Sequence, residues 1–127
     1  MLQTGVDIVE IPRVQRLARR YGERFRARVY TTREWIDCDG RAPSLAARFA
    51  AKEATIKALG SRRPALHEIE VVGGLGERPR IRLSGRAAEL AREQGVRELA
   101  LSLSHAQEHA VAMVVLLREG EASPPWE

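Results

Sequence analysis

Residues 44–60 of the chain read SLAARFAAKEATIKALG, and this stretch predicts a long central helix. Ser44 follows Pro43 as a good N-cap, strong helix formers fill the interior, and Gly60 supplies the C-terminal stop. At about 100° per residue, one stripe roughly 80° wide forms the face expected to pack on the core. That stripe contains Leu45, Phe49, Ile56 and Leu59.

Three charged residues lie on or beside this stripe. Lys52 projects into it, and Glu53 and Lys57 lie along its edge, one turn apart. A helix facing the core tolerates such charges when they are paired, when they reach solvent, or when they have a function. The structural alternative is an i, i+4 ion pair between Glu53 and Lys57 on a solvated flank, worth about 0.2–0.5 kcal/mol.

Length and composition predict one domain of residues 1–118 with a polar tail at 119–127 that we expect to be flexible. The chain is 44% hydrophobic and 30% charged, as in soluble globular proteins. Its longest apolar run, Ala110–Leu117, is too short to span a bilayer, so no membrane association is predicted. No signal peptide is evident and Cys38 is the only cysteine, so we expect a reducing, cytoplasmic location.

The net charge is +4, from 21 Lys and Arg residues against 17 Asp and Glu residues, and arginine predominates. The planar guanidinium suits phosphate and carboxylate recognition. The charge balance therefore favours an anionic partner, which could be a nucleic acid, a phosphorylated cofactor or an acidic protein.

Asp7 stands in an unusual place for a carboxylate. Residues 3–11 predict a strand, and Asp7 falls on the same face as Val9 and Ile11. Burying its charge costs several kcal/mol unless it meets a cation or hydrogen-bond donors. It is either a structural aspartate at a strand edge or a ligand for a hard metal ion.

An arginine ridge follows the first strand. Pro12 suits the first turn of a helix, whose residues Val14, Leu17 and Ala18 face inward. The ridge on the other face consists of Arg13, Arg16 and Arg20, with Arg24 beyond the helix-breaking Gly22. Such a ridge is either a solvated face or a docking surface for an acidic partner.

The rest of the chain predicts an α+β domain with a mainly antiparallel sheet packed on the central helix. The further elements expected are a short helix capped by Thr31 or Thr32, a hairpin of 69–72 and 80–83, a helix after Ser84 ending near Gln94, and paired strands at 99–104 and 110–117.

No Ser-His-Asp order, nucleophile elbow, P-loop or zinc spacing is present, and the glycines at 73, 74 and 76 do not form a phosphate-binding fingerprint. Two carboxylates brought together can hold Mg²⁺, and a lysine can neutralise a phosphate or protonate a leaving group. Asp7, Glu53 and the lysines beside Glu53 thus suggest metal-assisted chemistry on a phosphate or pyrophosphate.

Four blocks of the sequence resemble the holo-[acyl-carrier-protein] synthases, the small type of 4′-phosphopantetheinyl transferase. Their order and spacing agree with that family over nearly the whole chain. The blocks are Gly5–Arg13, Arg24-Phe25 with Arg28, Thr31 and Glu34, Arg48–Ala54 continuing through Lys57–Gly60, and Ser102–His105 followed by the apolar last strand.

This resemblance implies transfer of 4′-phosphopantetheine from coenzyme A to a serine of an apo acyl carrier protein, releasing adenosine 3′,5′-bisphosphate. Asp7 and Glu53 would hold Mg²⁺ together with the pyrophosphate of coenzyme A. Lys57 would face the same phosphates and protonate the departing one, and the base would be Glu53 or a metal-bound water. Mg²⁺ and Mn²⁺ both accept such oxygen ligands.

The resemblance also implies binding roles. Arg48, Lys52 and His105 become candidate contacts with coenzyme A. Because the carriers are acidic, the arginine ridge with Arg24 becomes the expected docking surface. The family is typically trimeric, with each active site between two protomers. The loop Ser61–Pro64 departs from it, because the family loop is commonly glycine-rich and lies near the cofactor.

Two other functions stay open at this stage. The fold could bind coenzyme A or a carrier protein without turnover, although binding alone does not need a metal beside the scissile phosphate. A basic nucleic-acid-binding domain is less favoured, because the chain has few aromatics and no nucleic-acid motif.

Overall fold

The computed structural model describes residues 1–74 and 76–119. The expectation of a flexible tail therefore falls almost entirely outside the described residues. In chain order the elements are β1 (Leu2–Glu10), α1 (Ile11–Tyr21), α2 (Glu23–Val29), α3 (Thr32–Cys38), α4 (Ala42–Leu59), the 3₁₀ turn η1 (Leu66–Glu68), β2 (Ile69–Gly74), β3 (Glu77–Leu83), α5 (Gly85–Glu93), β4 (Val96–His105) and β5 (His109–Arg118).

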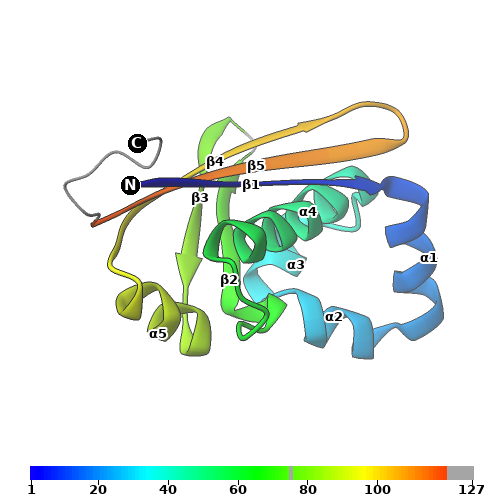
Figure 1. Ribbon diagram of the computed structural model, residues 1–127. Helices are drawn as coiled ribbons and strands as arrows, with labels where there is room; N and C mark the ends of the chain where they lie inside the picture. Colours follow the sequence, from blue (N-terminus) through cyan, green and yellow to red (C-terminus); the bar gives the residue numbers. More distant parts are fainter. Residues whose placement is uncertain (75, 120–127) are drawn as a thin grey trace.

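The α+β class and the antiparallel pairing are confirmed. The strands form a three-stranded sheet in the order β1-β5-β4 and a separate two-stranded sheet of β2 and β3, all paired antiparallel. Figure 1 shows the three-stranded sheet lying along α4, with α1 and α2 toward one end of the molecule, α3 near its middle and α5 at the other end. The central helix is thus the element on which the other parts pack.

The predicted start of the central helix was wrong. The helix begins at Ala42, with Arg41 in the N-cap position and no side-chain cap, so Ser44 lies inside the first turn. Pro43 causes the difference, since its missing N–H costs nothing in the first turn of a helix. The end was correct, because Gly60 adopts the left-handed conformation (φ 70°) expected of a terminating glycine.

The predicted apolar stripe on α4 was too narrow. Leu45, Ile56 and Leu59 are buried and Phe49 is half-buried, but alanines on the other sides are buried as well. The sheet covers one side of the helix, while β2 and the N-terminal helices contact others. A helix enclosed this way is apolar nearly all round, and its small alanines let the neighbouring elements approach closely.

The two faces of the three-stranded sheet differ. On β5 the inner residues Ala110, Ala112, Val114 and Leu116 are fully buried. The outer face stays open and apolar, with Val6 56%, Ile8 65% and Met113 49% exposed. The alternation of side chains along a strand puts apolar residues on both faces of the sheet, but within one chain only the inner face is covered.

None of the helices in residues 1–74 and 76–119 combines the length and apolar character needed to cross a membrane.

Candidate active site

Gly5 allows β1 to lie directly against α4. A Cβ at this position would lie 1.9 Å from the carbonyl oxygen of Ala54 and 2.9 Å from the backbone nitrogen of Ala58. No side chain fits there, so glycine permits backbone-to-backbone approach of strand and helix. Asp7, two residues along β1 on the same face, is thereby brought to the flank of α4 that carries Lys57.

Asp7 and Lys57 form an ion pair. The ammonium of Lys57 lies 3.1 Å from Asp7 Oδ1 and donates a second hydrogen bond of 2.9 Å to the carbonyl oxygen of Val6. The Asp7 side chain is 18% exposed and the Lys57 side chain 50%. The strand therefore gains a cation for its carboxylate while leaving one side of the pair open to solvent.

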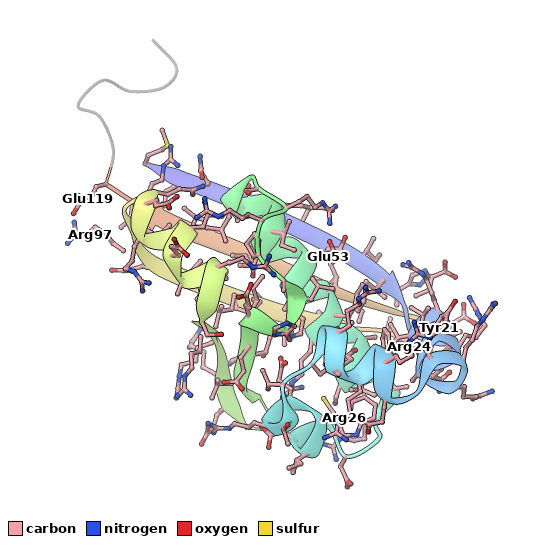
Figure 2. All side chains as sticks on the ribbon, turned by 90° about the horizontal axis from the view of Figure 1, so that it is seen from below. Tyr21, Arg24, Arg26, Glu53, Arg97 and Glu119 are labelled. Carbon is pink, nitrogen blue, oxygen red and sulfur yellow. The ribbon has the colours of Figure 1, made fainter. Side chains whose placement is uncertain are left out.

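Glu53 is paired with a different basic residue. Arg62, in the loop after α4, donates a 3.2 Å hydrogen bond from Nη1 to Glu53 Oε2. The alternative of a Glu53–Lys57 pair along the helix is wrong, since Lys57 reaches β1 instead. Figure 2 shows Glu53 projecting from α4, with Arg24 and Tyr21 farther along the molecule near the α1–α2 turn.

A cavity of about 680 Å³ opens beside Glu53. Arg24 and Arg28 of α2 line it, together with Arg62 and His67 from the chain that follows α4. Glu53 is the only acidic residue among the described residues of its lining, against three arginines. Such a hollow suits an anionic ligand, because the arginines supply several N–H donors for phosphate oxygens.

The donor chemistry of Asp7 and Glu53 fits a hard divalent cation. Both side chains offer carboxylate oxygens, both are partly exposed, and each already accepts a cationic side chain. Residues 1–74 and 76–119 contain no group of three or more His, Cys, Asp or Glu side chains placed to hold a metal. Two carboxylates alone suit Mg²⁺, which is usually held by one or two carboxylates plus water and substrate phosphates.

Lys52 lies in the core, which corrects the prediction that it contacts the cofactor. Its side chain has no exposed surface, and its ammonium lies 2.6 Å from Glu34 Oε1 and 2.5 Å from the carbonyl oxygen of Ile69. Glu34 also accepts hydrogen bonds from the backbone N–H groups of Thr31 and Val71. Burial lowers the pKa of Lys52, against the opposing effect of Glu34. This pair ties α3 and β2 to α4.

Arg48 and His105 lie apart from the Asp7–Lys57 pair. Arg48 is 5% exposed and donates a 3.2 Å bond from Nη2 to the carbonyl oxygen of Gly73, while its Nε is buried with no partner among the described residues. His105 is exposed at the end of β4 and pairs in register with Ala110. Their role as cofactor contacts stays a prediction.

The arginine ridge lies on α1 as predicted. A surface hollow there is lined by Tyr21, Leu17 and the arginines at 13, 16, 19 and 20. Arg24 begins the second part of this surface and also lines the cavity beside Glu53. The ridge therefore continues into the hollow that contains Glu53.

Sequence reasoning missed four features of this region. It noticed the basic loop at 61–64 but did not connect Arg62 with Glu53. It named Arg28 as part of one of the four sequence blocks, without placing it in a cavity, and nothing in the pattern pointed to His67. Glu34 as the partner of Lys52 had a weak signal, since Thr31 and Glu34 have capping-box spacing and form that box.

A family profile for the 4′-phosphopantetheinyl transferase superfamily matches residues 3–114. The chain belongs to this superfamily. It is 45% identical over 124 residues to the holo-[acyl-carrier-protein] synthase of Herpetosiphon aurantiacus, covering 91% of this chain and 98% of that protein. The resemblance inferred from the four sequence blocks is confirmed.

Solved structures of the superfamily have the same fold. The Helicobacter pylori holo-[acyl-carrier-protein] synthase in complex with coenzyme A superposes with a TM-score of 0.81 at 30% identity, over 90% of this chain and 99% of that one. A coenzyme A complex from Chronobacterium ammoniagenes gives a TM-score of 0.82 at 34% identity, over 94% and 99%. The predicted 4′-phosphopantetheinyl transferase fold is confirmed.

Proposed function

We propose that this protein transfers the 4′-phosphopantetheine group of coenzyme A to a serine hydroxyl of an apo acyl carrier protein. The products are the holo carrier and adenosine 3′,5′-bisphosphate. The observation that carries the proposal is a pair of partly exposed carboxylates beside α4: Asp7 of β1, paired with Lys57, and Glu53 of α4, which lines an arginine-rich cavity. The substrates are supported by the similarity to holo-[acyl-carrier-protein] synthases and to two structures of such enzymes with coenzyme A.

Asp7 and Glu53 would hold Mg²⁺ in this reaction, together with the pyrophosphate of coenzyme A. When bound, the ion would polarise the β-phosphate and stabilise the negative charge of the leaving bisphosphate. The nucleophile belongs to the carrier, so this chain needs no activated serine or cysteine of its own.

Lys57 supports the reaction from the same flank. In the reaction the serine oxygen forms a bond to the β-phosphorus while the bond from that phosphorus to the bridging oxygen breaks. The electron pair goes to the departing α-phosphate, and the serine proton goes to a base, for which Glu53 is a candidate. The ammonium of Lys57 lies within hydrogen-bond reach of Asp7 and can donate a proton to the departing phosphate.

The arginine ridge of Arg13, Arg16, Arg20 and Arg24 is the proposed docking surface for the carrier, whether of the fatty-acid or polyketide type. Its continuation into the cavity beside Glu53 would guide an acidic carrier toward the reacting phosphate. The positive charge of this ridge would also attract DNA, but binding of DNA would not require coenzyme A.

A homotrimer is proposed from the open face of the three-stranded sheet. Val6, Ile8 and Met113 form an exposed apolar surface that a second copy of the chain would cover. Sedimentation equilibrium would test this with Ile8→Glu, and Ile36→Glu as a control of similar exposure on α3. A monomeric wild type would overturn it.

The single buried cysteine, Cys38, suits the reducing cytoplasm in which we place the protein.

Mass spectrometry of apo acyl carrier protein incubated with this protein, coenzyme A and Mg²⁺ tests the transfer. A phosphopantetheine-sized mass gain is expected. It should disappear with EDTA and fall by about 10²-fold or more in Asp7→Asn and in Glu53→Gln. A mass gain that neither variant reduces would support the transferase activity but contradict the proposed metal site.

Two outcomes would favour other functions. Tight binding of coenzyme A without mass gain on several carriers would indicate a binding module. Binding to random duplex DNA with a steep salt dependence, and none to a carrier protein, would indicate a nucleic-acid-binding domain.

A further inference from the structure

The loop at residues 61–64 is a sequence feature to which the proposed function gives no role. The hydroxyl oxygen of Ser61 accepts a 3.1 Å hydrogen bond from the backbone N–H of Arg63. The guanidinium of Arg63 bonds Glu93 Oε2 on α5 at 3.0 Å, and Pro64 is buried. The loop is therefore held on its α5 side by a proline, a turn and an ion pair.

Arg62 points the other way, into the cavity beside Glu53. Its guanidinium makes a single 3.2 Å hydrogen bond with the Glu53 carboxylate, and its side chain is 77% exposed. An ion pair this exposed is weak and easily exchanged. Arg62 thus occupies an oxygen of Glu53 that a divalent cation would use, and it does so with a side chain that is free to turn.

The surroundings of Arg62 favour a phosphate as its second partner. Arg24, Arg28 and His67 line the same cavity, so a ligand phosphate there would meet several N–H donors. A guanidinium binds a phosphate through two parallel hydrogen bonds, which are stronger than its single bond to Glu53. A cation on Glu53 and a phosphate in the cavity would each release Arg62 from its present contact.

We propose that Arg62 exchanges partners when ligands bind, and that it is a determinant of nucleotide specificity. In the ligand-free protein it bonds Glu53. When a divalent cation binds Glu53, it bonds a phosphate oxygen of the nucleotide instead. This inference rests on the proposed function. It gives Arg62 two opposite effects, since it competes with the metal when the nucleotide is absent and helps to bind the nucleotide when it is present.

The test compares Arg62→Ala with Arg97→Ala in the full chain. Arg97 is exposed at the start of β4, lines no part of this cavity, and lies well away from Glu53 in Figure 2. It therefore controls for the loss of one positive charge. Electron paramagnetic resonance of Mn²⁺ measures metal binding without nucleotide, and calorimetry with adenosine 3′,5′-bisphosphate and Mg²⁺ measures nucleotide binding.

Arg62→Ala should strengthen Mn²⁺ binding about two- to fivefold, because an exposed ion pair is weak, while Arg97→Ala leaves it unchanged. The same variant should weaken binding of the bisphosphate about tenfold or more, because a charge-assisted contact is lost. Coenzyme A and 3′-dephospho-coenzyme A then identify the phosphate. A loss confined to coenzyme A assigns the 3′-phosphate, and equal losses assign the pyrophosphate.

Unchanged nucleotide binding in Arg62→Ala would overturn the phosphate role. Weaker or unchanged Mn²⁺ binding would overturn the competition. Wild-type protein distinguishes these failures from failure of the proposed function. If it modifies the carrier while Arg62→Ala behaves identically in both assays, only this inference fails. If it neither binds coenzyme A nor modifies the carrier, the proposed function fails.

Discussion

The chain contains only two lysines, Lys52 and Lys57, and both lie on α4. Five residues of separation place them about 140° apart around the helix. Lys52 is fully enclosed against Glu34, while Lys57 is half exposed against Asp7. One helix thus carries two lysine–carboxylate pairs in opposite surroundings.

The difference in surroundings distinguishes a structural ion pair from a candidate catalytic one. The Lys52–Glu34 pair is saturated, because backbone groups of Ile69, Thr31 and Val71 supply its remaining hydrogen bonds. It joins elements and has no room for a ligand. The Lys57–Asp7 pair is partly exposed to solvent, so its charged groups can contact a bound ligand. Surroundings rather than residue types distinguish a structural ion pair from a candidate catalytic one.

The largest expected effect comes from making the same substitution at both lysines. Lys52→Met should lower the free energy of unfolding by about 3–5 kcal/mol, because it leaves the carboxylate of Glu34 buried without its cation. Lys57→Met should cost less than about 1 kcal/mol, because a pair at the surface is screened by water. Urea unfolding followed by circular dichroism measures both.

A double variant tests whether the loss of stability in Lys52→Met comes from the unpaired carboxylate of Glu34. Glu34→Leu combined with Lys52→Met should recover part of the lost stability, because no charge is then left buried. Equal losses in the two single variants would contradict the contrast between the two pairs.

The next effect comes from Gly5, which brings β1 and Asp7 against the helix. Gly5→Ala should cost about 1–3 kcal/mol of stability, because the added Cβ meets the backbone of α4 and the strand must move away. Carrier modification should fall about tenfold or more even where the protein remains folded, since Asp7 moves relative to Glu53. Urea unfolding and the mass-spectrometric assay measure the two effects.

Thr4→Ala is the control for Gly5→Ala, because Thr4 is exposed on the outer face of the same strand. It should leave the stability and the activity close to those of wild type. Full activity in a folded Gly5→Ala protein would show that the approach of β1 to α4 does not position the site.

The smallest effect concerns Tyr30, whose ring lies 5.7 Å from the Lys52 ammonium on the buried side of α4. Burial raises the pKa of the Tyr30 phenol, whose hydroxyl donates a 2.7 Å hydrogen bond to the carbonyl oxygen of Leu45. The folded state therefore keeps a proton that the unfolded state loses above a pH of about 10, so this group's contribution to stability falls as pH rises further.

Tyr30→Phe tests this pH dependence. At pH 7 the variant should lose about 1 kcal/mol of stability with the hydrogen bond. The gap between wild type and variant should then shrink as the pH passes 10, because only the wild type has a phenol to deprotonate on unfolding. Urea unfolding at pH 7, 9 and 10.5 measures the gap, and a constant gap would contradict the raised pKa.

Much of the fold could be predicted because its signals are local. Gly60 ended the central helix, Gly22 broke the first one, and the alternation at 99–104 and the apolar run at 110–117 identified two paired strands. The errors came where packing overrides propensity. The start of α4 moved past Ser44 to Ala42, and a helix expected to have one buried stripe proved buried on most sides.

The sequence by itself determined the α+β class, the order of elements and the superfamily, because these follow from periodicity, capping residues and ordered motifs along the chain. It also marked Asp7, Glu53, Lys52 and Lys57 as charges in unusual places. Only the tertiary structure decided their partners. Lys52 meets Glu34, Lys57 meets Asp7, and Glu53 meets Arg62. Two of these contacts join distant parts of the chain and the third crosses a loop, so they depend on how strand, helix and loop pack together, which no local pattern encodes.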